Sequence, residues 1–471
     1  MKLRLQPWKN RLTPSGILQA ALSQEAQGPF NPRLLITYSY LIVSALGILV
    51  TSYLGISYSE SISSKVVDDW CDPNSEGVGK HCFSDFYSVV EIKHFSEPWS
   101  RGSTYPPLAI LISKLFSTLG TENSRIGLIA YLSVGLMALI IPVIHLKKAR
   151  IIKKVRNVLT VGITVICAGP SLMALDRGNN VLFLFPVVYF IYVYACQNKF
   201  GKVSALIVVG ALIKPQMIVL FIVPMLNQKI RPVLIGTSIY LFTNTLLFCF
   251  FPGNYLQNIG TWVGNLQGYQ TYPGMPSLGN YSFANAIGLI FGFTKVLTQG
   301  ATVGEVFRPG LTSTTVSILS VAYLIVVTTM LALRRAALDP KIQLLIGSSL
   351  IILVPGTSFG YYLIFLLVPL LFMEVSNDNT GQDFAPKRER EEFLFRINRI
   401  TRISLSILFL LVIPPWPFQW GMLNLGVNEV WDHYGIMPTF VGAILWLLPL
   451  ILLTNSKQKS SPSRLESTES S

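Results

Sequence analysis

Long apolar segments recur along almost the whole chain and are separated by shorter polar stretches. The run at 34–56 contains no charged residue, and at about 1.5 Å per residue it exceeds the ~30 Å hydrocarbon core of a membrane. Hydrocarbon offers no water to backbone N–H and C=O groups, so such segments must be helices that satisfy their own hydrogen bonds. The pattern therefore predicts an all-α, polytopic integral membrane protein.

We expect roughly ten spanning helices, at 34–56, 126–146, 158–175, 180–196, 232–251, 311–333, 342–356, 361–375, 403–419 and 436–454. A further apolar segment, 107–120, is only 14 residues long and is bounded by Pro107 and Gly120. This length suits an interfacial or re-entrant helix better than a full span.

The segment 203–226 differs from the other apolar runs because a charge and a proline interrupt its middle. Lys214 is followed directly by Pro215, and proline breaks a helix at that point. A charge at mid-membrane is costly unless it lines a wet cavity or meets a partner. We therefore predict a hairpin of two half-helices whose tip faces the outside. The alternative is one continuous span with a proline kink, which would invert every later loop.

Composition and charge fit the membrane interpretation. Hydrophobic residues make up 51% of the chain and charged residues 13%, against about 25% charged in soluble proteins. If the N-terminus lies on the inner side of the membrane and the spans alternate, the segments on the inner side hold 27 of the 37 Lys and Arg but only 10 of the 23 Asp and Glu. Those segments are 1–33, 146–157, 197–202, 227–231, 334–341, 374–402 and 455–471.

This asymmetry follows the positive-inside rule, so both termini are expected in the cytoplasm. The net charge of +14 then reflects topology and contact with membrane lipids, not binding to nucleic acid. We expect a cytoplasmic arm at 1–33, a multi-span membrane domain at 34–454 and a disordered tail at 455–471. The domain includes a first outside loop at 57–125, with the interfacial helix, and a later outside loop at 252–310.

Two cysteines share the first outside loop. Cys71 and Cys82 form an even pair in an oxidising compartment, which makes a disulfide the expected state and two thiols the alternative. Together with His81 they supply only three nearby metal ligands, so no metal is predicted. The chain has no Walker loop and no Gly-rich dinucleotide motif, so no cofactor is expected.

Polar groups gather on the predicted outer side of the membrane. One carboxylate with several cations there suits a negatively charged, lipid-borne substrate, because cations hold a phosphate and a carboxylate takes a proton from an attacking hydroxyl. The candidates are Asp85 as the carboxylate, with Glu91 and Asp176 as alternatives, and Arg177 and Lys214 as the cations. Asp176 could instead simply pair with Arg177.

Five short motifs follow one another in a recognisable order. They are Ser84-Asp85-Phe86-Tyr87, Thr104-Tyr105-Pro106-Pro107, Leu175-Asp176-Arg177-Gly178-Asn179, Gly210-Ala211-Leu212-Ile213-Lys214-Pro215 and Gly279-Asn280-Tyr281-Ser282-Phe283. From about residue 30 to 375 the chain resembles the GT-C fold glycosyltransferases, specifically the family of the polyprenol-phosphate-mannose-dependent α-1,2-mannosyltransferases of actinobacteria. A late turn ends in Tyr361-Tyr362 but lacks the His that the family often has there.

The resemblance implies a GT-C-like fold and an inverting sugar transfer, with mannose as the expected sugar. The donor would be a polyprenyl-phosphate-linked sugar, and the acceptor a glycolipid or glycan on the outer face. Asp85 falls on the position of the family's base, and Arg177 and Lys214 on positions that would hold the donor phosphate. The remaining motif residues expected to bind substrate are Asn179, Tyr105, Asn280 and Tyr362.

Two other functions remain open at this point. A transporter or flippase for a lipid-linked anion would be expected to place charged groups at mid-membrane on several helices, whereas most candidates here lie at the outside edge. A non-catalytic scaffold gives no reason for a broken helix that carries a buried lysine.

Overall fold

The computed structural model describes residues 83, 85–86, 98–100, 102–118, 124–148, 155–270, 281–283, 313–333, 340–355, 358 and 360–375, with single positions at 298, 412, 445, 447 and 449–450. This described part is helical and contains no strand, which confirms the all-α class there. The predicted elements at 1–33, 34–56, 376–402, 403–419, 436–454 and 455–471 lie outside it, apart from those single positions.

Two helices are long and apolar enough to cross a membrane. They are Ile126–Lys148, within α6 (Ser124–Lys148), and Ile230–Phe250, which joins α12 (Ile230–Leu247) to η4 (Phe248–Phe250). A third candidate is a bent pair, α7 (Val155–Cys167) and α8 (Gly169–Arg177). The described part is thus helical, with two or three apolar helices of spanning length.

The bent pair corrects the straight span predicted at 158–175. Its two helices meet at a 52° angle, because Ala168 is extended at the start of α8 and Pro170 occupies the first turn. Proline there cannot continue the preceding helix. The bend turns the C-terminal end of α8, at Arg177, away from the line of α7.

Four of the other predicted spans also appear as helices. They are η2 (Asn180–Phe183) with α9 (Leu184–Cys196), α16 (Ser313–Leu333), α17 (Pro340–Leu353), and η5 (Gly360–Leu363) with α18 (Ile364–Val375). Each falls in the range predicted for it to within a few residues. Hydropathy therefore located these elements, although two of them begin with a short 3-10 helix that it did not reveal.

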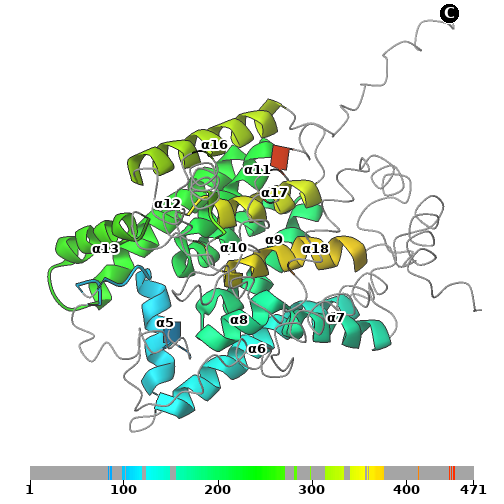
Figure 1. Cartoon of the computed structure of the whole chain (residues 1–471), viewed down its shortest axis with the longest axis horizontal. Helices are drawn as coiled ribbons and strands as arrows, with labels where there is room; N and C mark the ends of the chain where they lie inside the picture. The colour runs from blue at the N-terminus through cyan, green and yellow to red at the C-terminus, as the bar shows by residue number, and fades with distance from the viewer. Residues whose placement is uncertain are drawn as a thin grey trace, which may run out of the picture.

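The short apolar segment after the first outside loop forms α5 (Pro107–Thr118). Its 12 residues cover only ~18 Å, which is too short for a membrane. It packs against α6, α10 and α12 and lies crosswise to the direction of α6 (Figure 1). The helix is thus too short for a full span, as predicted, and its interfacial position stays a prediction.

The interrupted segment folds back on itself. α10 (Phe200–Ile213) ends at Lys214, and η3 (Pro215–Phe221) and α11 (Ile222–Leu226) follow. A Cβ at Gly236 of α12 would lie 2.8 Å from Phe221 and 3.4 Å from Ser204. In one continuous helix those two residues would be ~25 Å apart. The predicted hairpin is therefore confirmed over the alternative of a kinked span, with Lys214 at its tip.

The first part of the predicted outside loop at 252–310 contains a helix that the sequence did not indicate, α13 (Tyr255–Gln270). Asn254 begins it, since its Oδ1 accepts from the backbone N–H groups of Leu256 (3.0 Å) and Gln257 (3.2 Å). Asparagine is a preferred residue at this position. The helix carries Asn, Gln and Gly throughout, so hydropathy alone did not indicate it.

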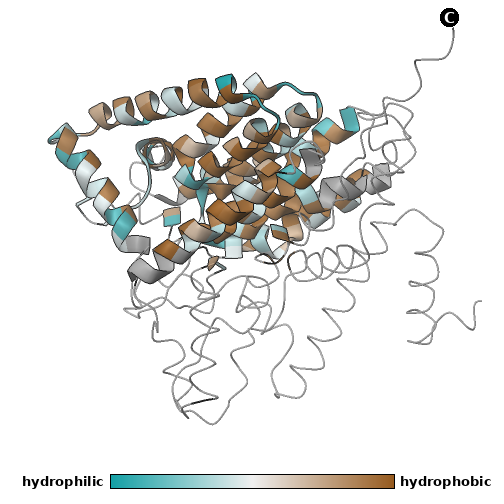
Figure 2. Cartoon of the chain, turned by 90° about the horizontal axis from the view of Figure 1, so that it is seen from above, coloured by the Kyte–Doolittle hydropathy of each residue, from teal (hydrophilic) through white to brown (hydrophobic). Residues whose placement is uncertain are grey.

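The core lies among α9, α10, α17 and α18, most of whose apolar side chains are buried. By contrast, α6, α12 and α16 present large apolar side chains outward, among them Met137, Phe242 and Leu333, which are 64%, 69% and 80% exposed. Figure 2 shows apolar residues along the helices and polar ones mainly at their ends and on the turns. Exposed apolar faces of this kind are the surfaces that a membrane protein presents to lipid.

The two ends of the helix bundle differ in charge. α6 and α9 run in the same direction, since a Cβ at Gly135 would lie 2.8 Å from Leu182 and His145 Nδ1 lies 2.8 Å from Tyr189 Oη. The chain reversals at the end reached by their C-termini, here called the basic end, carry Lys147, Lys148, Lys199, Lys202, Lys229 and Arg231. In Figure 1, α7 starts near this end, on the right, and α5 and α13 lie at the opposite end.

Candidate active site

The segment that carries Asp85 lies against the C-terminal end of α8. The Phe83 N–H donates to the Asp176 carbonyl at 2.8 Å. Gly178 ends the helix in the left-handed region at φ +61°, and a Cβ there would lie 2.9 Å from Phe86 Cβ. Only glycine both adopts this conformation at little cost and allows this close approach. The turn after α8 thus brings Asp85 beside residues 177–179.

Asp85 is held between an amide and a guanidinium. Asn179 Nδ2 donates to Asp85 Oδ2 at 2.6 Å, and Arg177 Nη1 lies 3.9 Å from Asp85 Oδ1. The side chains of Arg177 and Asp85 are 11% and 17% exposed, so solvent screens this pair only in part. We call Asp85, Asn179 and Arg177 the carboxylate half of the site.

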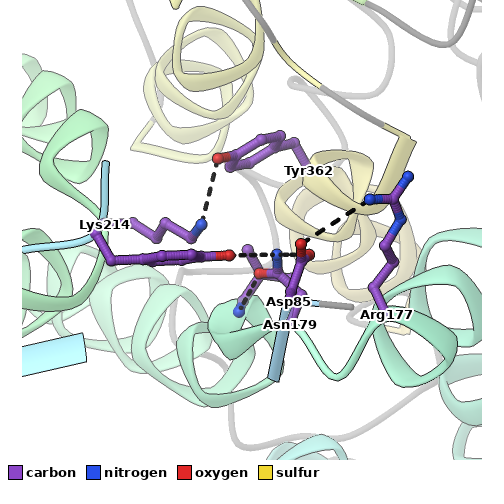
Figure 3. Close-up of polar contacts among 7 residues, drawn as sticks. Asp85, Arg177, Asn179, Lys214 and Tyr362 are labelled. Carbon is purple, nitrogen blue, oxygen red and sulfur yellow. Dashed lines mark hydrogen bonds and ion pairs between the residues drawn. The ribbon is translucent and has the colours of Figure 1, made fainter. Parts of the chain in front are cut away.

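Lys214 lies on the other side of Asp85 and Asn179 from Arg177 (Figure 3). Its Nζ donates to the Tyr362 hydroxyl at 3.4 Å and lies 4.5 Å and 5.4 Å from the ring centroids of Tyr105 and Tyr362. The residue is only 6% exposed. We call Lys214, Tyr105 and Tyr362 the ammonium half. Such cation–π contacts are worth ~0.5–2 kcal/mol each.

Tyr105 connects the two halves, because Asn179 Nδ2 also donates to its hydroxyl, at 3.4 Å. Three side chains that no motif indicated hold the loop that carries it. The Trp99 indole N–H donates to the Tyr105 carbonyl at 3.0 Å. From α13, Trp262 donates to the Thr104 carbonyl at 3.1 Å and Asn265 to the Trp99 carbonyl at 2.6 Å. The sequence feature that could have indicated this support is a tryptophan in an outer loop, because a buried indole N–H needs a hydrogen-bond partner.

The turn that ends in Tyr361-Tyr362 also lies at this end of the bundle. The Tyr281 N–H donates to the Ser358 carbonyl at 2.7 Å, and the Tyr361 and Tyr362 rings lie 4.8 Å apart. Burial raises the pKa of Tyr281 above its ordinary value, so its hydroxyl stays protonated at neutral pH. The contact places Tyr281, the middle residue of the Gly279-to-Phe283 motif, beside the turn that carries Tyr362.

Six of the seven residues predicted to act on substrate come together: Asp85, Arg177, Asn179, Tyr105, Lys214 and Tyr362. The seventh, Asn280, lies outside the described residues, as do Glu91 and the predicted disulfide pair Cys71 and Cys82. The functional roles assigned to the six remain predictions, but their proximity is a property of the structure.

The arrangement combines a carboxylate, two cations and three polar donors at one end of a helical bundle. A carboxylate can take a proton, and flanking cations can hold an anionic group. No group of three or more His, Cys, Asp or Glu side chains within the described part of the chain could hold a metal ion. The six residues themselves offer acid–base and electrostatic chemistry.

Comparisons with known proteins found no match that indicates a function, so the site is the main evidence for it. No protein-family model matches the chain. No curated protein matches it either.

Proposed function

We propose that this chain is an integral membrane glycosyltransferase that moves a sugar from a polyprenyl-phosphate donor to a lipid-linked or glycan acceptor. The observation that carries the proposal is Asp85, a carboxylate held at 2.6 Å by an amide and set between the cations Arg177 and Lys214. Sugar transfer from such a donor needs a base for the acceptor hydroxyl and positive charge for the leaving phosphate. The donor is already activated, so neither ATP nor a redox cofactor is required.

In this proposal Asp85 deprotonates the acceptor hydroxyl, which attacks the anomeric carbon from the face opposite the phosphate. The bond from that carbon to the phosphate oxygen breaks, and the configuration inverts. The polyprenyl phosphate leaves with the bonding electron pair and with negative charge, which a nearby cation stabilises. A buried ammonium such as Lys214 acts strongly here because a low-dielectric site increases its interaction with the phosphate. The resemblance suggests mannose as the sugar.

The same proposal includes a GT-C-like fold with about ten spans, cytoplasmic termini and a site on the outer face. Its support is that Asn179, at the start of η2 and α9, and Lys214, at the end of α10, lie at the end of the bundle opposite to the basic end. Basic residues favour the cytoplasmic side. Among the residues whose side chains the structure describes, Lys214 is also the one buried charged residue, at 6% exposed. A single buried charge at the site favours surface chemistry over transport along several charged helices.

The decisive experiment is a transfer assay with purified protein, radiolabelled polyprenyl-phosphate sugars and a native lipid extract. We expect labelled sugar to appear on a lipid or glycan acceptor. Asp85→Asn keeps the size of the side chain but removes the proton-accepting charge, so transfer should fall at least ~10²-fold while the donor still binds. Asp176→Asn is the matched control. An inactive Asp176→Asn beside a fully active Asp85→Asn would move the base to position 176.

Orientation is tested separately by cysteine labelling in intact cells. Lys148 at the basic end and Gln257 on α13 are both exposed, so each accepts a cysteine without loss of packing. A membrane-impermeant maleimide should label Gln257→Cys and spare Lys148→Cys, relative to the unsubstituted protein. The reverse pattern would place the site in the cytoplasm and rule out an acceptor on the outer face.

A further inference from the structure

Asn179 is fully buried, and the fold itself sets its orientation. Its backbone N–H donates to the Ala174 carbonyl at the end of α8 (2.9 Å), and its Oδ1 accepts from the Val181 N–H at the start of η2 (3.0 Å). An asparagine in this position caps the helix that follows. Because Oδ1 faces a backbone donor, the Nδ2 group must face the opposite way, toward Asp85.

Both hydrogens of that Nδ2 group are engaged, one with Asp85 Oδ2 at 2.6 Å and one with the Tyr105 hydroxyl at 3.4 Å. A side-chain amide nitrogen has only two hydrogens to donate. Asn179 therefore has no remaining N–H for a sugar hydroxyl or a phosphate oxygen. This conflicts with the substrate-binding role that its place in the motif suggested.

We infer that Asn179 is a positioning residue, which fixes the Asp85 carboxylate and the Tyr105 hydroxyl relative to each other and does not bind substrate. The inference rests on the proposed function, because it concerns the base of that reaction. Without Asn179, the Arg177 guanidinium, now 3.9 Å from Asp85 Oδ1, would draw the carboxylate into a direct ion pair. A displacement of about 1 Å in a reacting group can cost ~10²-fold in rate.

The ammonium half should depend on Asn179 much less. Tyr105 contacts Lys214 through its ring, 4.5 Å from Nζ, and contacts Asn179 through its hydroxyl. Loss of the hydroxyl contact leaves the ring in place, since Trp99 and α13 hold the loop through its backbone. Changes at Asn179 should therefore slow transfer without a matching loss of donor affinity.

The test uses Asn179→Ser in the full-length protein. Serine is a good capping residue, so η2 should still start correctly, but its side chain is too short to reach Asp85. Asn254→Ser is the matched control, because Asn254 caps α13 in the same way and is exposed. Two quantities are measured: the transfer rate at saturating donor, and the Kd for polyprenyl phosphate without a sugar.

We expect Asn179→Ser to transfer at least ~10²-fold more slowly with a Kd within about threefold of the native value, a change below 1 kcal/mol. Asn254→Ser should match the native protein in both. If Asn179→Ser weakens binding as much as it slows transfer, Asn179 is a substrate ligand and the inference is wrong. A native transfer rate in Asn179→Ser would overturn it as well.

A second measurement needs no transfer and so separates this inference from the proposed function. Asn179→Asp puts two carboxylates face to face, and its thermal unfolding midpoint in detergent should fall. Adding Asp85→Asn restores an amide–carboxylate pair with the partners exchanged, and should recover at least half of the lost midpoint while transfer stays low. If the exchanged pair recovers nothing, Asn179 does not fix residue 85. If the native protein transfers no sugar, the proposed function fails, but recovery would still establish the contact.

Discussion

The two halves of the candidate site hold their charges in different ways. In the carboxylate half, Asp85 accepts a 2.6 Å hydrogen bond from Asn179 and lies 3.9 Å from the guanidinium of Arg177. In the ammonium half, Lys214 Nζ meets one tyrosine hydroxyl and two aromatic rings. Within the described ranges, Lys214 has no carboxylate at ion-pair distance.

This difference shows which half is ready for an anionic ligand. A buried ammonium is costly unless it is paired, and each ring offsets only ~0.5–2 kcal/mol of that cost. The carboxylate half is already balanced by an opposite charge, whereas the ammonium half is not. An incoming phosphate would neutralise Lys214 and leave the Asp85–Arg177 pair as it is. The two cations, which looked equivalent in the sequence, should therefore contribute unequally to donor binding.

The largest expected effect is on donor affinity. Lys214→Met keeps the length of the side chain but removes the charge, and a charge-assisted contact is worth ~1.5–3 kcal/mol. The Kd for polyprenyl phosphate, measured on purified protein, should rise about 10–150-fold. Arg177→Met is the matched comparison and should change the Kd much less, because its guanidinium faces Asp85. Equal losses in the two variants would remove the distinction between the halves.

The next effect concerns the turn that brings Asp85 into place. Gly178→Ala puts a Cβ in the left-handed region, which costs ~1–2 kcal/mol, and 2.9 Å from Phe86 Cβ. We expect a lower unfolding midpoint and at least ~10-fold slower transfer, with donor affinity retained. Gly201→Ala is the control, since a Cβ there meets nothing within 4 Å. Loss of donor binding in Gly178→Ala would show that the halves are not independent.

A smaller effect should come from the support of the Tyr105 loop. Asn265 donates to the carbonyls of Trp99 (2.6 Å) and Ser103 (3.0 Å), and each such bond contributes ~1 kcal/mol. Asn265→Ala should therefore lower the stability of this region and weaken polyprenyl phosphate binding several-fold by loosening Tyr105. Gln267→Ala, at an exposed position of the same helix, should leave both unchanged. The two variants are compared by thermal unfolding and by Kd.

The smallest effect is expected from Tyr362→Phe, which removes a 3.4 Å hydrogen bond to Lys214 but keeps the ring. A bond to a charged group at this distance should contribute no more than ~1 kcal/mol, or about fivefold in donor Kd. Tyr362→Leu also removes the ring and should cost more. A phenylalanine variant as weak as the leucine variant would mean that the hydroxyl, not the ring, holds Lys214.

The sequence predicts features of this fold that depend on local composition. Apolar runs located α6, α9, α12 and α16, and the Lys214-Pro215 break predicted the hairpin, because charge and proline act at their own positions. α13 could not be found in this way, since its polar residues are paired with a distant loop through Trp262 and Asn265. The bend at Ala168 was missed because no charged residue lies between Arg156 and Asp176, so the segment had the composition of a single span.

The site shows the same division between local and distant information. Ordered motifs selected Asp85, Arg177 and Lys214 as residues that act together, and the structure places them close to one another (Figure 3). Their mutual arrangement was not predictable, because it depends on the bend between α7 and α8 and on the packing of the loop that carries Trp99 and Tyr105. The sequence treated the two cations as equivalent, whereas the fold pairs one with Asp85 and surrounds the other with aromatic rings.

The contacts of the site join segments that are made at very different times. Asp85 and Asn179 are 94 residues apart in the chain, and Lys214 and Tyr362 are 148 residues apart. Synthesis proceeds at ~5–20 residues per second, so Lys214 enters the membrane several seconds before its tyrosine partner exists. A shortened chain that ends before residue 362 could build the carboxylate half but would leave the lysine only partly enclosed. The complete site can therefore form only after the second half of the protein has been synthesised and inserted.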